Sequence, residues 1–563
     1  MSDTDTSARS VATFTLTSNG KVVSGKLQVL SLTISTELNR IPAALITVLD
    51  GEASRQTFAA SNAPDFAPGA ELEIALGHQG KDDTVFKGIV IRHSIKVRTH
   101  ASVMVVEARD KAARMTTHPR SRYFHDMKDS AVIEELLRSH QLDGDVAATG
   151  VQHEQLVQYR CTDWDFMLCR ADVNGLVCIV EDGKVRVAKP DGSKARSMVL
   201  AYGNGIKDLD CEIDARDQFV GVSAVGWNPA DQTLVPGVVA DDPPVPRVGN
   251  LSAEALAGVT GSKPLELCHG GRDTEAELRA WANANLLKQR LGKVRGVARI
   301  EGNANVKPGH WVELQGAGER FEGKLLVSGV RHELQNGTWD TVVQLGLAPR
   351  AFAERFDVAE RAAGSMLAPV HGLQFGVVTQ IEKDPRGEDR IMVRVPAIHA
   401  SDDGSWARLA TADAGAGRGT VLRPEIGDEV VVGFVNADPR CAVVLGSLPS
   451  SAHASPIPPS DKNDQKGLKS RSGIRVLIDD DKKSLLLETP GGNSIRISDD
   501  DQGITIKDQN GNKLVMGSQG IQIESAKDLA LKASANLKAV GSATAEVSSS
   551  GNTTIKGAMV AIN

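Results

Sequence analysis

The chain has 563 residues, too many for one hydrophobic core, and three or four domains are expected. A net charge of −7 and the absence of any block of Lys or Arg argue against a nucleic-acid partner. No apolar run is long enough to span a membrane, and the polar, acidic residues 1–6 do not resemble a secretory signal peptide.

Because most of the six cysteines lie beside apolar residues and none forms a Cys-x-x-Cys pair, we predict buried free thiols in a reducing cytoplasm for Cys161, Cys169, Cys178, Cys211, Cys268 and Cys441.

Residues 1–365 are predicted to hold two β-rich stretches with helices between them. Aliphatic runs separated by Pro and Gly indicate a barrel or sandwich at the start, and a second β-rich stretch covers 296–346. Between them, helices are predicted over 130–140 and from Thr162 to near Gly175. The strands expected in the first stretch cover 27–34, 44–49, 72–76, 88–97 and 101–108.

The clearest helix is predicted between Thr274 and Leu291. Thr274 and Glu277 have the spacing of a capping box, and Gly292 ends the pattern. Lys288 and Arg290 are expected to face the negative end of the helix dipole. One apolar stripe is formed by Leu278, Trp281, Ala282 and Leu286.

Residues 366–450 are predicted to form a small closed barrel of the oligonucleotide/oligosaccharide-binding (OB) type. Five strands within about eighty residues are typical of that fold. They are expected at 375–380, 390–395, 406–410, 429–435 and 442–445. The Ser-, Pro- and Lys-rich residues 451–473 are interpreted as a linker.

From Ile474 to Asn563, short pieces alternate apolar and polar residues and recur every seven to eleven residues. Turn-forming clusters such as 490–493 and 509–512 separate them. Each piece offers only two or three aliphatic side chains, so its apolar face has to meet other copies. The pattern therefore predicts a needle of interwound chains, with about ten strands per chain and a height on the order of 50 Å at roughly 4.8 Å per layer.

A single-chain β-solenoid or sandwich is the alternative for this segment. Such a core normally contains larger side chains, whereas residues 474–563 include no Phe, Tyr or Trp. A narrow trimer axis lined by Ile, Leu, Val and finally Ala fits the composition better, and the late alanines indicate a taper.

Several weaker patterns resemble sites of chemistry, but no catalytic, cofactor-binding or metal-binding residues are predicted. Gly415–Gly419 lacks the helix and the Lys-Ser or Lys-Thr of a phosphate loop. The acidic clusters 479–481 and 499–501 lack the closing Glu of a calcium loop and are interpreted as solvated corners. Asp163 and Asp165 are explained by helix capping. No standard zinc-site spacing is found among His140, His153, Cys161 and Cys169.

Several motifs together resemble the VgrG-type spike proteins of contractile injection systems, which include extracellular injection systems, type VI secretion systems and phage tails. Gln158–Phe166 is similar to that family's Gln-Tyr-Arg-Glu-Thr-Asp-Tyr-Asp-Phe, with Cys161 in place of Glu. Arg423–Phe434 is the most specific match, although Ala437-Asp438-Pro439 departs from the more usual Gly-Asp before Pro. Further matches are Gly302–Gly309, Gly376–Val378, Asp384–Gly387, Arg390–Pro396 and Ile555–Asn563.

The resemblance implies a mainly β protein: a hub of two β-barrels with helical insertions (1–365), an OB-fold collar (366–450), a linker (451–473) and a triple-stranded β-helix needle (474–563). It implies a homotrimer whose two barrels per chain present six similar units to a hexameric inner-tube protein. Baseplate proteins and a PAAR-like tip protein at the C-terminal end are the other partners it implies, with cargo effectors as a further class. Contraction of a sheath then drives the spike through a target membrane, with which contact is transient.

We therefore predict a structural spike rather than an enzyme. The linker leaves no room for an inserted lysozyme, and the chain ends on the repeat, without an appended toxin. We expect the chain to be made in the cytoplasm without a signal peptide and then to be incorporated in an injection particle. An extracellular injection system is favoured, with a type VI secretion spike as the alternative. A trimeric glycan-cleaving tail spike and an adhesin are less favoured, because neither a groove with paired carboxylates nor a binding head is visible.

Overall fold

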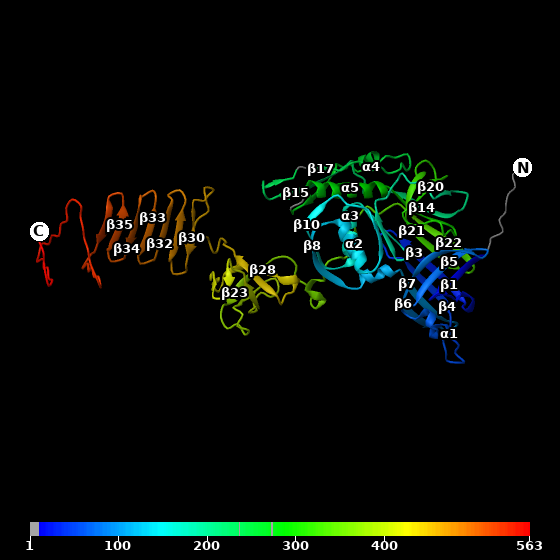
Figure 1. Cartoon of the computed structure of the whole chain (residues 1–563), viewed down its shortest axis with the longest axis horizontal. Coiled ribbons are helices and arrows are strands. Elements are labelled where there is room, and N and C mark those ends of the chain that lie inside the picture. Colours follow the sequence, from blue (N-terminus) through cyan, green and yellow to red (C-terminus); the bar gives the residue numbers. More distant parts are fainter. Residues whose placement is uncertain (1–10, 236, 272–273, 563) are drawn as a thin grey trace. The chain divides into compact units, whose positions relative to one another are not determined.

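The computed structural model describes residues 11–235, 237–271 and 274–562, so the polar residues 1–6 lie outside the described part. The chain divides into two compact units, residues 1–361 and 362–563 (Figure 1). Strands far outnumber helices in both units, and the prediction of a mainly β fold is confirmed.

One sheet of 13 strands runs through the first unit. Its N-terminal half contains β1 (Ala12–Ser18), β2 (Lys21–Val22), β3 (Val29–Glu37), β4 (Ala43–Leu49), β5 (Glu71–His78), β6 (Lys81–Val97) and β7 (Ser102–Arg109). Its C-terminal half contains β13 (Met198–Ala201), β14 (Ile206–Ile213), β19 (Val294–Glu301), β20 (Trp311–Gln315), β21 (Gly323–Gln335) and β22 (Thr338–Leu345). All five strands predicted at the N-terminal end are confirmed in type.

The long strand β21 joins the two halves of this sheet. Its first residues pair with β20, as in Trp311 opposite Leu326, and its last seven pair with β3, from Gly329 opposite Glu37 to Gln335 opposite Ser31. The two barrels that were predicted are therefore two halves of one continuous sheet. Pairing β3 with β21 removes an exposed edge that separate halves would each have to protect.

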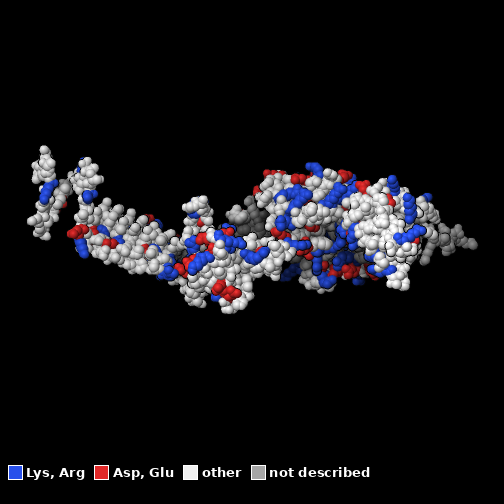
Figure 2. All heavy atoms as spheres, turned by 90° about the horizontal axis from the view of Figure 1, so that it is seen from below, with Lys and Arg blue, Asp and Glu red and all other residues white. Residues whose placement is uncertain are grey.

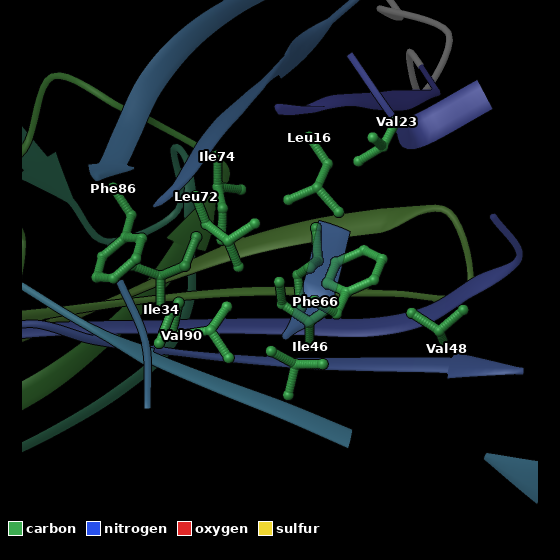
Figure 3. Packing of buried hydrophobic residues seen from close by; sticks show 14 of the residues in the cluster. Leu16, Val23, Ile34, Ile46, Val48, Phe66, Leu72, Ile74, Phe86 and Val90 are labelled. Carbon is green, nitrogen blue, oxygen red and sulfur yellow. The ribbon is translucent and has the colours of Figure 1, made fainter. Parts of the chain in front are cut away.

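Each half of the sheet has its own hydrophobic core. Figure 3 shows the first core, in which Phe66 from the short turn η2 (Pro64–Phe66) lies among aliphatic side chains of β1, β3, β4 and β5, including Leu16 and Ile46. A second cluster, with Val312, Leu325 and Val343, fills the other half. The alternation of buried and exposed residues along these strands, as in the pattern of β5, is what the sequence predicted.

The insert between the halves carries the helices. Around α2 (Asp129–Ser139) and α3 (Asp163–Val173) lie a two-stranded ribbon of β8 (Pro119–Lys128) and β10 (Gln152–Thr162), and a small sheet of β9 (Asp143–Val146), β11 (Val177–Glu181) and β12 (Lys184–Ala188). The next segment contains β15 (Val222–Asn228), β16 (Thr233–Leu234), β17 (Val238–Val239), α4 (Ala253–Val259), β18 (Leu265–His269) and α5 (Glu275–Leu291). Short turns of helix are α1 (Ala59–Asn62), α6 (Phe352–Arg355), η1 (Ser24–Lys26), η3 (Lys111–Thr116), η4 (Ala362–Ser365) and η5 (Val435–Ala437).

The helix α5 confirms the predicted capping box, because Thr274 Oγ1 accepts from the backbone N–H of Glu277 and Glu277 Oε2 accepts from that of Thr274. Leu278, Ala282 and Leu286 are buried as expected, and Trp281 is half-buried. Lys288 and Arg290 lie in the last turn of α5, as predicted. Lys288 is in addition only 6% exposed, and its Nζ forms a buried ion pair with α3, 2.8 Å from Asp172 Oδ2, which the sequence did not indicate.

The predicted burial of the cysteines is correct only in part. All six are free thiols, but of these only Cys178 is buried, and Cys268 and Cys441 are exposed. Cys268 lies on the outward side of β18, and Cys441 lies in the turn before β29, so apolar sequence neighbours did not imply burial. Among the residues described, no helix is both long and apolar enough to cross a membrane.

The second unit begins with a closed barrel whose strands follow the order β23-β24-β25-β29-β28. They are β23 (Gln374–Gln380), β24 (Ile391–Arg394), β25 (Ser405–Leu409), β28 (Glu429–Phe434) and β29 (Ala442–Ser447), in agreement with all five predicted strands. A hairpin of β26 (Ala414–Gly415) and β27 (Arg418–Gly419) projects between β25 and β28. The rest is a seven-stranded sheet of β30 (Gln465–Lys469), β31 (Arg475–Asp479), β32 (Ser484–Glu488), β33 (Ser494–Ser498), β34 (Gly503–Lys507), β35 (Lys513–Gly517) and β36 (Gly520–Glu524).

A cluster of three rings, one pair stacked and the other tilted, connects the halves of the first unit. Trp339 of β22 is 3% exposed, and its ring lies 5.2 Å from that of His78 of β5 and 5.7 Å from that of His332 of β21. Gly302 packs directly against the indole: a Cβ at this position would lie 2.0 Å from Trp339 Cδ2. The Gly302 of the family motif is therefore required by close packing.

We expect Gly302→Ala to destabilise the first unit by about 2 kcal/mol or more, because the indole or the backbone has to shift to admit the methyl group. Thermal unfolding of the full chain measures this. Gly150→Ala is the matched control, since a Cβ at Gly150 meets no atom within 4 Å. Equal melting temperatures for the two variants would contradict the role assigned to Gly302.

A pH dependence is expected from His332, because burial of its ring lowers the pKa to about 4. Below the unfolded-state pKa of roughly 6.5, the unfolded chain binds a proton that the folded chain excludes, so stability falls as pH falls from there toward 4. The expected loss is about 2 kcal/mol between pH 7 and pH 5.

Urea unfolding followed by tryptophan fluorescence at both pH values tests this expectation. In His332→Gln, which retains a polar group opposite Thr341 Oγ1, the loss between pH 7 and pH 5 should be smaller by that amount. Carboxylates affect both proteins alike, so the difference between them isolates His332. The same pH response in both proteins would show that His332 does not contribute.

Candidate assembly surface

In the seven-stranded sheet, every strand pairs antiparallel with its neighbours in sequence, and the register places the apolar side chains in two columns. Paired residues in an antiparallel ladder lie on the same face, so both columns share one face. We call the residues of the two columns the needle face. The first column is Val476, Leu487, Ile495, Ile506, Leu514 and Ile523; the second is Ile478, Leu485, Ile497, Ile504, Met516 and Ile521.

The needle face is not covered within one chain. Ile497 is 43% exposed, Ile523 56% and Ile521 70%. In Figure 2, the segment that holds β30–β36 shows mostly uncharged side chains on the side in view, with charged ones toward its two ends. The opposite face is mixed and carries Arg496, Thr505 and Gln522 beside aliphatic residues. Because fully burying one Leu or Ile stabilises by roughly 1.5–3 kcal/mol, two columns of such residues are a large unused source of stability.

A repeat of two strands builds this surface. β31, β33 and β35 begin at Arg475, Ser494 and Lys513, a constant step of 19 residues. Equivalent positions in the first two repeats have the same role: Asp479 Oδ1 accepts from the N–H of Lys482 at 3.0 Å, and Ser498 Oγ accepts from the N–H of Asp501 at 3.0 Å. Each therefore caps the corner that follows its strand.

These caps explain the acidic clusters. The N–H of Lys482 and the amide of Gln465 lower the pKa of the Asp479 carboxyl, which is 7% exposed. The other carboxylates of the clusters 479–481 and 499–501 are exposed, in agreement with the prediction of solvated corners.

Within the single chain described, each strand from β30 to β36 pairs with its neighbours in sequence. Seven strands cover residues 465–524, where about ten were expected over 474–563, and residues 525–562 form no strand in the chain as described. β30 lies inside the segment that was interpreted as a linker, where Leu468 of a polar stretch pairs with Val476.

In the first unit, the motif Gln158–Phe166 is the centre of a buried polar network. Asp163 is 1% exposed, and its carboxylate accepts from Arg122 Nη2 at 2.7 Å, Gln158 Nε2 at 2.8 Å and His140 Nε2 at 2.8 Å. Burial opposes ionisation, but these hydrogen bonds outweigh it and lower the pKa of Asp163. Asp163 was assigned to helix capping, which was wrong, since Thr162 caps α3 by accepting from the N–H of Asp165.

A second buried network was not predicted. His153, 6% exposed, lies between Asp129 Oδ2 at 3.0 Å and Glu277 Oε1 at 2.9 Å, so each ring nitrogen contacts a carboxylate. Arg170 of α3 and Asn174, the residue that follows α3, also donate to Asp129. Burial would raise the pKa of Asp129, but the bonds from His153 and Arg170 hold it well below its ordinary value. The capping box revealed Glu277, but no local pattern could reveal a partner 124 residues away.

The other residues that the sequence offered as candidates for a metal or phosphate site have structural roles. His140 and His153 belong to the two separate networks, and Cys161 and Cys169 pack at the edge of the helical core. Gly415–Gly419 spans the β26–β27 hairpin, closed by an Arg418–Asp413 ion pair. Within the described ranges, no group of three or more His, Cys, Asp or Glu is arranged to hold a metal ion.

Comparison with known families covers most of the chain. Residues 8–336 match the model of the Alg8 N-terminal domain. Residues 374–448 match the type VI secretion system/phage-baseplate injector OB domain, and residues 484–563 match the phage baseplate V C-terminal trimerisation domain.

Two curated relatives are type VI secretion system spike proteins of Pseudomonas aeruginosa. VgrG1a is 26% identical over 194 residues, which is 32% of this chain and 29% of the relative, and VgrG4b is 28% identical over 268 residues, 39% of this chain and 33% of the relative. The chain thus spans about a third of the length of the curated relatives it matches.

Two solved structures are also similar. The 43 kDa tail protein of prophage MuSo2 from Shewanella oneidensis has a TM-score of 0.46 at 13% identity and covers 60% of this chain and 98% of its own. A tail protein from Neisseria meningitidis MC58 has a TM-score of 0.45 at 17% identity, covering 60% and 96%.

The first match alone covers more than half of the chain, and the two injector modules follow it in order: the chain belongs to the Alg8 N-terminal domain family and has VgrG-type spike proteins of contractile injection systems among its homologues.

Proposed function

We propose that this chain is the trimeric hub and spike of a contractile injection apparatus. The observation that carries the proposal is the needle face, whose two apolar columns are exposed although every ladder hydrogen bond from β30 to β36 is made within the chain. Three such sheets that turn their needle faces toward a common axis bury these columns and leave the mixed face outside. The match of residues 484–563 to a trimerisation domain supports the same arrangement.

The first unit is proposed to cap the inner tube and to join it to the baseplate. Two sheet halves with separate cores give six similar β modules in a trimer, a number that suits a hexameric tube protein. The C-terminal end is proposed to carry a PAAR-like tip protein, and cargo effectors are a further proposed partner class. The role is mechanical: we propose that the chain has no catalytic activity and that it pierces the target membrane when a sheath contracts.

The particle and its location are part of the proposal. The chain is proposed to be made in the cytoplasm and incorporated in an extracellular injection particle. A type VI secretion spike is the second candidate, favoured by the names of the curated relatives, which both belong to type VI systems.

We expect light scattering of the purified full chain to give about three times the 59.8 kDa chain mass. Ile506→Lys should reduce this to the mass of one chain, because three lysines would otherwise be buried together at the axis, and the dissociation constant should rise at least ~100-fold. A mass that is unchanged in Ile506→Lys would contradict burial of the needle face.

The neighbouring residue supplies the matched control. Thr505 lies on the opposite face of the same strand, so Thr505→Lys introduces the same charge into β34 without entering the axis. This variant is expected to keep the three-chain mass. Loss of the trimer in both variants would indicate damage to the strand rather than to the needle face.

A further inference from the structure

The small barrel carries apolar side chains on both sides of three adjacent strands. Its interior is filled by Val378, Val430 and Val444, all fully buried. On the outside of β23, Phe375 is 65% exposed and pairs with Val431 of β28. An antiparallel sheet that meets water on one side normally alternates apolar and polar residues, and strands that are apolar on both sides are normally covered on both.

The exposed residues form one continuous patch. A Cβ placed on Gly433 of β28 would lie 3.4 Å from Leu373 Cδ2 and 3.6 Å from Leu445 Cδ1, so these two leucines flank Gly433 on the outer side. Leu373 is 64% exposed and Leu445 51%. We call Leu373, Phe375, Val431, Gly433 and Leu445 the barrel face.

The other wall of the same barrel is different. Arg394 of β24 and Arg408 of β25 occupy outward positions, next to the inward Val393 and Ala407. The outward pair Met392–Trp406 of the same two strands is apolar but half-buried. Among the barrel strands and the residue that precedes β23, the apolar side chains that are more than half exposed are therefore Leu373, Phe375 and Leu445. Such a patch on one side of a small domain marks a contact surface.

We propose that the barrel face is an interface between copies of this chain. This inference rests on the trimer proposed above. Residues 448–464 separate β29 from β30, a connection that reaches at most ~60 Å even when fully extended. Three barrels tethered to one needle stay at a high effective concentration, on the order of millimolar for a short flexible linker, so that even a weak apolar contact between them forms.

Site-resolved maleimide labelling of the full chain, analysed by mass spectrometry, tests the proposal. Leu445→Cys places a thiol on the barrel face, and Ile398→Cys places one on a turn of the same barrel at a position that is 62% exposed. We expect Leu445→Cys to react at least about tenfold more slowly than Ile398→Cys in the native protein and equally fast in urea. Phe375→Cys repeats the test at a second position of the barrel face.

Light scattering of each variant separates this proposal from the trimer itself. Equal labelling rates in a particle of three-chain mass would overturn the barrel interface and leave the trimer intact. A one-chain mass for the unmodified protein would overturn the trimer, and with it the inference. If the thiol is reactive in the purified spike but protected in the assembled particle, another protein occupies the barrel face and the proposal is wrong.

Discussion

The backbone hydrogen bonds of the needle are made within one chain, whereas its apolar side chains are left without a covering layer. Every strand from β30 to β36 pairs within the chain, so the polar groups of the ladder need no other copy. The aliphatic columns of the needle face do, because a single sheet of five-residue strands has nothing to pack against them. In the proposed trimer, burial of these columns would supply the driving force for association, while the strand pairing within each chain sets the direction and register of each strand.

The first unit relies on a different interaction, the buried carboxylate. Asp163 fixes α3 to β8 and α2 through Arg122 and His140, and Asp129 fixes α2 to α3 and, through His153, to α5. A buried charge that loses a partner is costly, so each network is satisfied in only one arrangement of its helices. Hydrophobic packing stabilises the two sheet halves, whereas these ionic contacts fix the helices of the insert relative to one another.

The sequence predicts much of this structure where the signal is local. Strand alternation located the five-stranded barrel and six strands of the needle, and the spacing of Thr274 and Glu277 gave the start of α5. What could not be predicted depends on long-range contacts: the pairing of β3 with β21 that merges two barrels, the ion pair that buries Lys288, and His153 between two carboxylates. The needle face was identified from its alternation, but the pairing of each strand with its sequence neighbours was not, since alternation specifies a face and leaves the partner open.

The step of 19 residues between β31, β33 and β35 limits how a needle of this kind can change its length. One added strand would reverse the direction of the chain, so that it would leave the sheet at the opposite ends of the strands. Two added strands restore both the direction and the side from which the chain leaves. Viable insertions and deletions should therefore occur as whole hairpins, and the length of the needle should vary between relatives in increments of two strand spacings, about 9.6 Å.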